Sequence, residues 1–170
     1  MDPSTRRQWK ALTEHVTWWL IPLIIVIIAA SAFPYLARQR AEARQQSCLS
    51  NLKSIALWTR MYAEDNDHRL PPGQDWVGQL GEHVKNRSVL ECPSDPVRHR
   101  VSYGFNRDLF GADVEPLDRP RSRVLYHDGR AGVVVERHDG GANYSFADGH
   151  AEWRAHPPES LNATVAEEGG

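Results

Sequence analysis

The sequence predicts an α+β protein in which a long N-terminal helix, partly transmembrane, packs on a small antiparallel β-sheet. Three observations predict this class. Residues 16–37 form an uncharged and largely apolar run, and a helix needs roughly 20 such residues to cross the hydrocarbon core of a bilayer. Residues 38–53 contain no Gly or Pro, so we expect the helix to continue beyond the apolar run. Short segments with the composition of strands occupy the C-terminal half.

The expected helix covers residues 18–65 and follows a polar N-terminal tail at 1–15. A kink is expected at Pro34, because proline removes a backbone hydrogen bond from the helix interior. The second half has a stripe spaced by four, three, four and three residues: Cys48, Leu52, Ile55, Thr59 and Tyr62. Side chains at this spacing share one face of a helix. We expect that face to be buried on a sheet of the same chain, with Trp58 in the core.

The remaining elements follow from turn residues and short apolar runs. The Asn and Pro residues of segments 65–67 and 70–73 end the helix, and a short helix is expected at 76–84. Five strands are expected, at Val101–Asn106, Arg123–His127, Val133–Arg137, Ala142–Ala147 and His150–Arg154. The organisation is therefore a tail (1–15), a membrane segment (16–37), a folded domain (38–156, with helix 38–65) and a disordered tail (157–170).

Two Asp-Gly pairs in the C-terminal half indicate turns. Asp148-Gly149 lies between two expected strands, and we predict a two-residue hairpin turn of type I′, in which both residues have positive φ. His127-Asp128-Gly129 places a base beside an acid, and we interpret it as a second turn rather than as a catalytic pair.

Composition and motifs argue against two classes of function. The net charge is −2 with both signs mixed along the chain, so no basic surface for nucleic acid is predicted. The sequence has no nucleophile elbow, phosphate-binding loop or metalloprotease motif, and no pair of cysteines at zinc spacing. We therefore expect a non-enzymatic protein without a cofactor.

Cys48 and Cys92 are the two cysteines of the chain, and both follow the apolar segment. In an oxidising compartment they can form one disulfide, whereas in the cytoplasm they would be two small core residues. A disulfide across this loop would stabilise the fold by about 4 kcal/mol through loop entropy. Both alternatives are open from the residues alone.

His138, Asp148 and His150 are weak candidates for a metal site, to which Asp139 could add an oxygen ligand. His138 and His150 each begin an expected strand region, so they could approach one another. Calcium needs six to eight oxygen ligands and structural zinc four ligands, and neither set is evident. The alternative is that Asp148-Gly149 serves only the turn and that His138 hydrogen-bonds a loop backbone; we favour this alternative and expect no metal.

Local composition determines neither which end of the membrane segment faces the cytoplasm nor whether the segment is retained or cleaved off as a signal peptide. Three basic residues precede the segment and three follow it, so the excess of positive charge that marks a cytoplasmic side is nearly balanced. Ala30-Ser31-Ala32 resembles the small-residue site at which a signal peptide is cleaved. The apolar run is longer than a usual signal sequence, however, and Pro34 would follow the cut.

Several segments together resemble a known family of bacterial pilin-like proteins. The helix segments 29–57 and 61–67 resemble the N-terminal helix of that family, and CPSD (92–95), SYGFN (102–106) and residues 137–153 resemble its C-terminal domain. Nine residues separate His138 from Asp148-Gly149, which is similar to the signature of the prepilin-type H-X9-DG group, related to type II secretion pseudopilins. The resemblance covers residues 23–154.

The N-terminal processing motif of that family is missing. Members usually have a Gly-Phe pair at the start of the apolar helix, where a peptidase cuts, and a Glu that docks the subunit into a filament. These positions correspond to Leu12, Thr13 and Thr17 here, and Glu14 lies three residues too early. The resemblance therefore implies a pilin-like anchor and domain without processing or efficient filament assembly.

The resemblance implies a structural role. We expect a single-pass protein of the bacterial inner membrane with its C-terminal domain extracytoplasmic, acting as a pseudopilin-like component or accessory of a type II secretion or type IV pilus-like system. Its partners would be the lipid bilayer and other pilin-like subunits or an inner-membrane secretion platform. The alternatives are a membrane-tethered ligand- or metal-binding domain, with calcium as the candidate ion, and a secreted domain released by signal-peptide cleavage.

Overall fold

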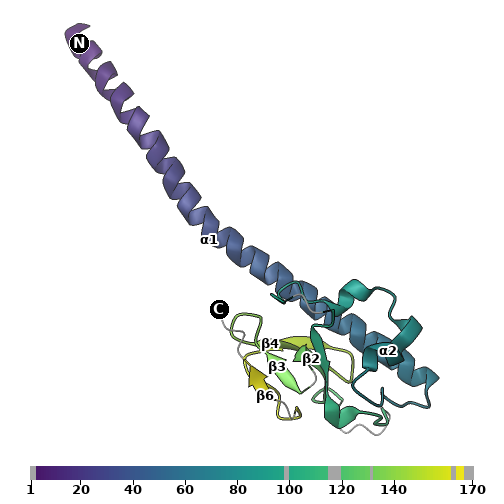
Figure 1. Cartoon of the computed structure of the whole chain (residues 1–170). Coiled ribbons are helices and arrows are strands. Elements are labelled where there is room, and N and C mark those ends of the chain that lie inside the picture. The colour runs from purple at the N-terminus through teal and green to yellow at the C-terminus, as the bar shows by residue number, and fades with distance from the viewer. Residues whose placement is uncertain (1–2, 98–99, 115–119, 131, 162–163, 167–170) are drawn as a thin grey trace. The chain divides into compact units, whose positions relative to one another are not determined.

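The computed structural model describes residues 3–97, 100–114, 120–130, 132–161 and 164–166, apart from the side chains of 3–17, 165 and 166. The fold class is α+β, as predicted (Figure 1). Five helical elements are α1 (Pro3–Asp65), α2 (Trp76–Leu80), η1 (Gly81–His83), η2 (Arg87–Leu90) and η3 (Arg107–Leu109). Six strands are β1 (Tyr103–Phe105), β2 (Val124–Arg130), β3 (Val133–Val135), β4 (Ala142–Phe146), β5 (Ala151–Arg154) and β6 (Thr164–Ala166).

Helix α1 belongs to two compact units, which divide after Arg40. The helix begins at Pro3 and therefore includes most of the predicted polar tail, and it continues through Pro22 and Pro34. In the first unit the large apolar side chains from Trp18 to Leu36 are exposed, typically by half or more of their surface. Such a segment is long and apolar enough to cross a membrane.

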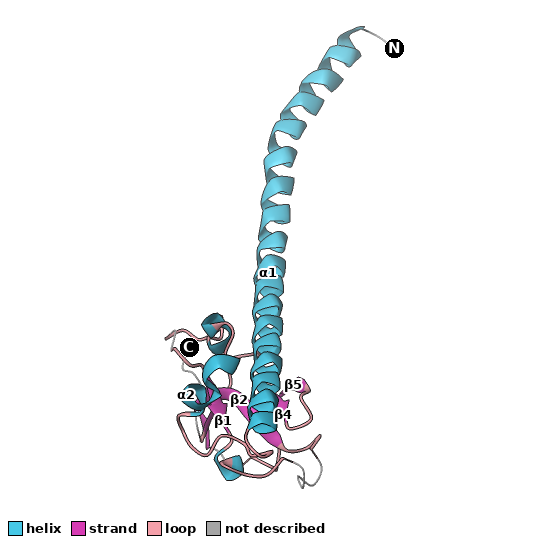
Figure 2. Cartoon of the chain, turned by 90° about the vertical axis from the view of Figure 1, so that its right-hand side faces the viewer, coloured by secondary structure: helices cyan, strands magenta, loops and turns pink. Residues whose placement is uncertain are grey.

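In the second unit, one face of α1 is buried in the main core, as the spacing predicted. Cys48, Leu52, Ile55 and Thr59 are each 0% exposed, and Tyr62 is partly buried at the edge of the same core. Trp58 and residues of α2, η2, β1 and β2 complete this core. Figure 2 shows α2, β1, β2 and β4 gathered around the end of the helix.

The sheet is mainly antiparallel, with the strand order β5-β4-β2-β3-β6 and with β1 also paired to β2. Four of the five predicted strand segments contain β1, β3, β4 and β5, and the fifth, Arg123–His127, covers only the first part of β2. Strands β2 and β3 approach closely at Gly129, and glycine makes this feasible: its φ is 120°, and a Cβ there would lie 2.2 Å from the carbonyl oxygen of Val133. The short predicted helix at 76–84 is also present, as α2 and η1.

The prediction of a disordered tail from residue 157 is wrong for the part that the structure describes. Strand β6 pairs in parallel with β3, and Leu161 is buried in a second apolar cluster with Val134, Tyr144 and Phe146. The tail has few apolar residues, so its composition resembles that of a disordered segment. The open edge of β3 supplies backbone partners that composition cannot reveal. Residues 162–163 and 167–170 lie outside the described part.

The hairpin between β4 and β5 is present, but its turn is not of the predicted type. Gly149 has a φ of 91°, whereas Asp148 is not among the described residues with positive φ. The amide of Gly149 donates to the carbonyl of Phe146, and the amide of Phe146 donates to the carbonyl of His150. These bonds enclose a three-residue loop with glycine in the left-handed position, which is the next most common hairpin geometry.

Candidate functional site

A group of polar side chains is buried between the second half of α1 and the sheet. We call it the buried polar cluster, and its members are Cys48, Cys92, Asp95, Ser102, Asp128, Arg137 and His138. The cluster joins α1, the turn at 92–95, the loop before β1, strand β2 and the segment after β3. Charged groups in such surroundings are costly unless each is paired.

Cys48 and Cys92 are joined by a disulfide, which is one of the two states that the residues alone allowed. Cys48 lies on the buried face of α1, and Cys92 is the first residue of the turn 92–95, in which the amide of Asp95 donates to the carbonyl of Cys92. Their Cα atoms are 5.3 Å apart, a usual separation for a disulfide. The bond therefore fixes this turn against the helix.

Asp95 and Arg137 form a buried ion pair beside the disulfide. Arg137 Nη2 lies 3.4 Å from Asp95 Oδ2, and the two side chains are 2% and 0% exposed. Ser102 Oγ donates to the same carboxylate oxygen at 2.7 Å, and Arg137 Nη1 donates to the carbonyl of Ser102 at 2.8 Å. These bonds close a ring of contacts between the segment 95–102 and Arg137, which lies 35 residues after Ser102.

His138 lies between the disulfide and the carboxylate of Asp128. Its Nε2 is 3.6 Å from Cys92 Sγ and 3.4 Å from Asp128 Oδ2. Burial, with help from the nearby charges of Arg137 and Arg44, lowers the pKa of His138 to about 4. The imidazole is therefore neutral at pH 7, and its contact with Asp128 is a polar contact of a neutral ring rather than an ion pair.

A tight turn presents His138 to the cluster. The amides and carbonyls of His138 and Gly141 hydrogen-bond each other, and Asp139 and Gly140 between them have φ values of 53° and 70°. This is the two-residue turn with positive φ at both positions that we predicted for Asp148-Gly149. The indole Nε1 of Trp153 on β5 donates to the carbonyl of His138 at 2.6 Å, which holds the turn on the sheet.

The three predicted metal candidates do not come together. His138 lies beyond the start of β4, near Trp153, whereas Asp148 and His150 lie beyond its other end and hydrogen-bond each other. A five-residue strand is about 17 Å long, so the expected approach of His138 and His150 is wrong. The side chain of His138 also faces Asp128 and Cys92 rather than a loop backbone, which corrects the alternative interpretation.

Asp128 is the member of the cluster that the sequence interpretation misplaced. His127 and Asp128 lie within β2 and are fully buried, so the predicted turn at 127–129 is wrong. The carboxylate of Asp128 accepts a hydrogen bond from the amide of Asn143 on β4 at 2.8 Å. One signal in the sequence could have found it. A charged residue directly follows an apolar strand segment, at a position where the alternation of side chains along a strand turns it toward the protein interior.

Asn143 and Ser145 add polar groups to the same face of the sheet. Ala142, Tyr144 and Phe146 belong to the second apolar cluster, so the alternation of a strand turns Asn143 and Ser145 toward the other face. Both side chains are fully buried, and neither makes a hydrogen bond within the described structure. Buried polar atoms of this kind call for an explanation, such as a bound water or ion.

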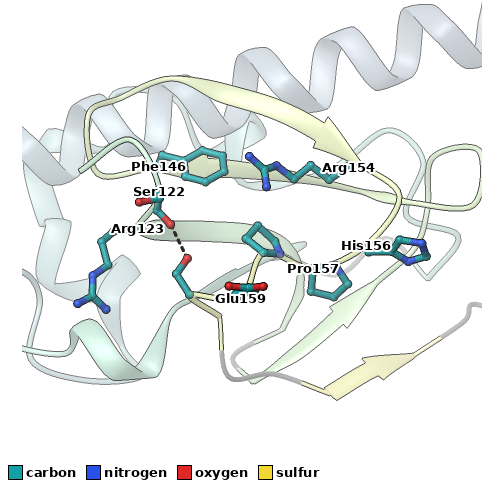
Figure 3. A pocket seen from close by; sticks show the side chains of 9 residues that line it. Ser122, Arg123, Phe146, Arg154, His156, Pro157 and Glu159 are labelled. Carbon is teal, nitrogen blue, oxygen red and sulfur yellow. Dashed lines mark hydrogen bonds between the residues drawn. The ribbon is translucent and has the colours of Figure 1, made fainter. Parts of the chain in front are cut away.

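A separate cavity of about 740 Å³ opens at the far side of the sheet, between β4, β5 and residues 156–160. Figure 3 shows Arg154 reaching toward Phe146, with Glu159 on the facing side. The guanidinium carbon lies 5.4 Å from the centre of the Phe146 ring, and Arg154 also bonds Glu152 at 2.6 Å. Since both signs of charge surround this cavity, it favours no particular class of ligand.

Comparison of the chain with protein-family models, with curated proteins and with solved structures finds no match.

Proposed function

We propose that this chain is a non-enzymatic, single-pass membrane protein that acts as a pilin-like structural component or accessory of a secretion or pilus-type assembly. In this proposal the segment 16–37 is a permanent anchor in the bacterial inner membrane, and the C-terminal domain is extracytoplasmic. The observation that supports it best is helix α1 itself. One uninterrupted helix supplies an exposed apolar segment and then, from Cys48 onward, the buried face of the domain core.

The disulfide supports the proposed orientation. Disulfides persist in oxidising compartments such as the bacterial periplasm and are rare in the cytoplasm. Cys48 and Cys92 are both buried and bonded in the core of the C-terminal unit. A domain built around this bond is suited to the extracytoplasmic side, and this supports the orientation that the charge count left open.

The resemblance to the H-X9-DG group supports the assembly role. The residues of this chain that match the signature of that group lie at two different places in the domain. His138 belongs to the buried polar cluster, and Asp148-Gly149 forms the β4–β5 loop. These are positions that hold the domain together. The side chains at the missing processing motif, Leu12, Thr13 and Thr17, lie outside the described part, so an unprocessed N-terminus remains a prediction from the sequence.

Photo-crosslinking in the native membrane tests the assembly role. A benzophenone amino acid at Ile25, in the exposed apolar segment, is expected to crosslink to the helices of other single-pass subunits. The control is the same residue at Val97, which is 66% exposed in the C-terminal unit. Adducts with lipid alone from Ile25 would overturn the assembly role and favour a tethered domain.

Two simpler measurements test the anchor. Alkaline phosphatase fused at the C-terminus should be active, because that enzyme needs an oxidising compartment for its own disulfides. The intact mass of the protein from the membrane fraction should correspond to a start at or near Met1. A mass that starts near Phe33 would mean that the apolar segment is a cleaved signal peptide, and the protein a secreted domain.

The cavity beside Arg154 favours the second candidate function, a membrane-tethered ligand-binding domain. Its volume of about 740 Å³ is within the range of small-molecule sites. Native mass spectrometry of the protein extracted from its own membrane would reveal a retained small molecule. If one is retained, substitution of Arg154 by Ala should release it.

A further inference from the structure

We infer that Cys48, Cys92, His138 and Asp128 form a tetrahedral zinc site when the disulfide is reduced, so that either an S–S bond or a Zn²⁺ ion closes the same centre. This inference concerns the purified protein and is independent of the proposed assembly role. It also differs from the sequence-based candidates, because it includes neither Asp148 nor His150.

The donor atoms are already gathered. The sulfurs of Cys48 and Cys92 and a ring nitrogen of His138 lie within 4.8 Å of one another, and all three residues are buried. Asp128 supplies a fourth donor, since its Oδ2 is 3.4 Å from His138 Nε2. Two thiolates, one imidazole and one carboxylate are ligands that Zn²⁺ accepts in a four-coordinate site.

Two of the separations match edges of a tetrahedron around zinc. With the usual zinc–ligand bond lengths, the N···O edge is about 3.4 Å and the S···N edge about 3.6 Å. His138 Nε2 lies 3.4 Å from Asp128 Oδ2 and 3.6 Å from Cys92 Sγ. The sulfur–sulfur edge must lengthen, to about 3.8 Å, and reduction of the disulfide permits this. The Asp128 carboxylate lies outside the group of donor atoms that are all within 4.8 Å of one another, so it must also move toward the sulfurs.

The surroundings orient the ligands in the manner of known metal sites. The amide of Asn143 donates to Asp128 Oδ2 at 2.8 Å and fixes the carboxylate. The turn at 138–141 and the bond from Trp153 fix the backbone of His138. Partners of this kind orient the ligands of metal sites. The unpaired side chain of Asn143 adds buried polar atoms on the same face of the sheet.

A phosphine reductant can break the disulfide and free both sulfurs for metal binding in a balanced reaction. Tris(2-carboxyethyl)phosphine breaks the S–S bond and becomes the phosphine oxide by taking the oxygen of one water molecule, and the two sulfurs take up its two hydrogens. Zn²⁺ then replaces the two thiol protons, which are released to solvent. Without reduction the sulfurs are bonded to each other, and the site lacks both thiolate ligands.

Cobalt binding to the full-length protein in detergent tests the inference. Co²⁺ is the probe, because tetrahedral coordination with thiolates gives strong visible bands and a near-ultraviolet charge-transfer band. We expect these bands at one Co²⁺ per chain after reduction, their absence in the oxidised protein, and their loss on addition of Zn²⁺. A reduced protein that gives no such bands, whether folded or unfolded by circular dichroism, overturns the site.

Variants distinguish metal binding at the native site from metal binding by the two thiols alone. His138→Gln and Asp128→Asn should each weaken Co²⁺ binding at least tenfold. His150→Gln is the matched control, because this histidine is partly exposed and pairs with Asp148 instead, and it should bind as the unmodified protein does. If His138→Gln and His150→Gln bind Co²⁺ equally well, the thiols bind metal without the cluster, and the inference is wrong.

Discussion

The two halves of α1 differ in what surrounds them, although they form one helix. From Trp18 to Leu36 the large apolar side chains are exposed on every face, whereas from Cys48 to Thr59 a single stripe is buried at 0% exposure. A helix that is apolar all round is suited to a membrane, and a helix with one apolar stripe is suited to a sheet or another helix. The comparison teaches that the hydrophobic pattern alone separates a half suited to a membrane from a half buried in the domain core.

Charged substitutions in the apolar half of α1 should have the largest effect, and they should change only membrane insertion. Ile24→Asp combined with Ile27→Asp places two carboxylates near the centre of the apolar segment and should disfavour insertion by roughly 6 kcal/mol. The thermal unfolding of the purified domain should be unchanged, because neither side chain belongs to its core. Carbonate extraction of membranes and a melting curve in detergent measure the two effects.

The control for that experiment is the conservative pair Ile24→Val and Ile27→Val, which should stay in the membrane fraction. If the aspartate variant remains fully inserted, the apolar half is held by something other than lipid. If its melting temperature falls instead, the apolar half of α1 also contributes to the stability of the domain.

The packed half should show the reverse behaviour. Leu52→Asp buries an unpaired charge in the main core and should destabilise the domain by about 5 kcal/mol, with no loss of membrane retention. Leu57→Asp is the matched control five residues along the same helix, because Leu57 is 57% exposed. It should change the free energy of unfolding by less than about 0.5 kcal/mol.

Urea or thermal denaturation followed by circular dichroism measures this pair of variants. Equal stability of Leu52→Asp and Leu57→Asp would mean that the stripe on α1 faces a partner in solution rather than the sheet.

Acid should destabilise the C-terminal domain through His127, which lies on β2. Burial lowers the pKa of His127 to about 4, while the unfolded chain has the ordinary value of about 6.5. Between these pH values the unfolded state binds a proton that the folded state does not, so stability is complete above pH 6.5 and falls as the pH decreases. The expected loss by pH 4 is about 3 kcal/mol, to which His138 adds in the same direction.

The free energy of unfolding measured by urea from pH 8 to pH 4 gives this profile. His127→Gln should flatten it, whereas substitution of the exposed His156 should leave it unchanged. A profile that His127→Gln leaves equally steep would assign the acid sensitivity to other groups.

The smallest effect concerns one hydrogen bond between the helix and the sheet. The hydroxyl groups of Thr59 and Tyr126 lie 2.7 Å apart, and both residues are 0% exposed. Thr59→Val keeps the shape but leaves the Tyr126 hydroxyl unpaired, which should cost about 1.5 kcal/mol. Ser54→Ala removes an exposed hydroxyl that bonds only its own helix and serves as the control. Indistinguishable melting curves for the two variants would show that the Thr59–Tyr126 bond adds no stability.

Much of the fold could be predicted because it depends on local patterns. The stripe Cys48, Leu52, Ile55 and Thr59 is buried as its spacing required, and the segments predicted as strands overlap β1 to β5. The site was less predictable. Asp128 looked like part of a turn because Gly129 follows it, yet it lies in β2, where Gly129 is needed for the close approach of Val133.

Alone, the sequence determined the α+β class, the apolar segment and the buried face of α1, because each follows from the periodicity of neighbouring residues. Only the tertiary structure decided that Cys48, Cys92 and His138 come together with Asp128 beside His138, and that β6 is added to the sheet. The physical reason is distance along the chain. Contacts between residues tens of positions apart depend on strand register and on which turn is made, and local composition encodes neither.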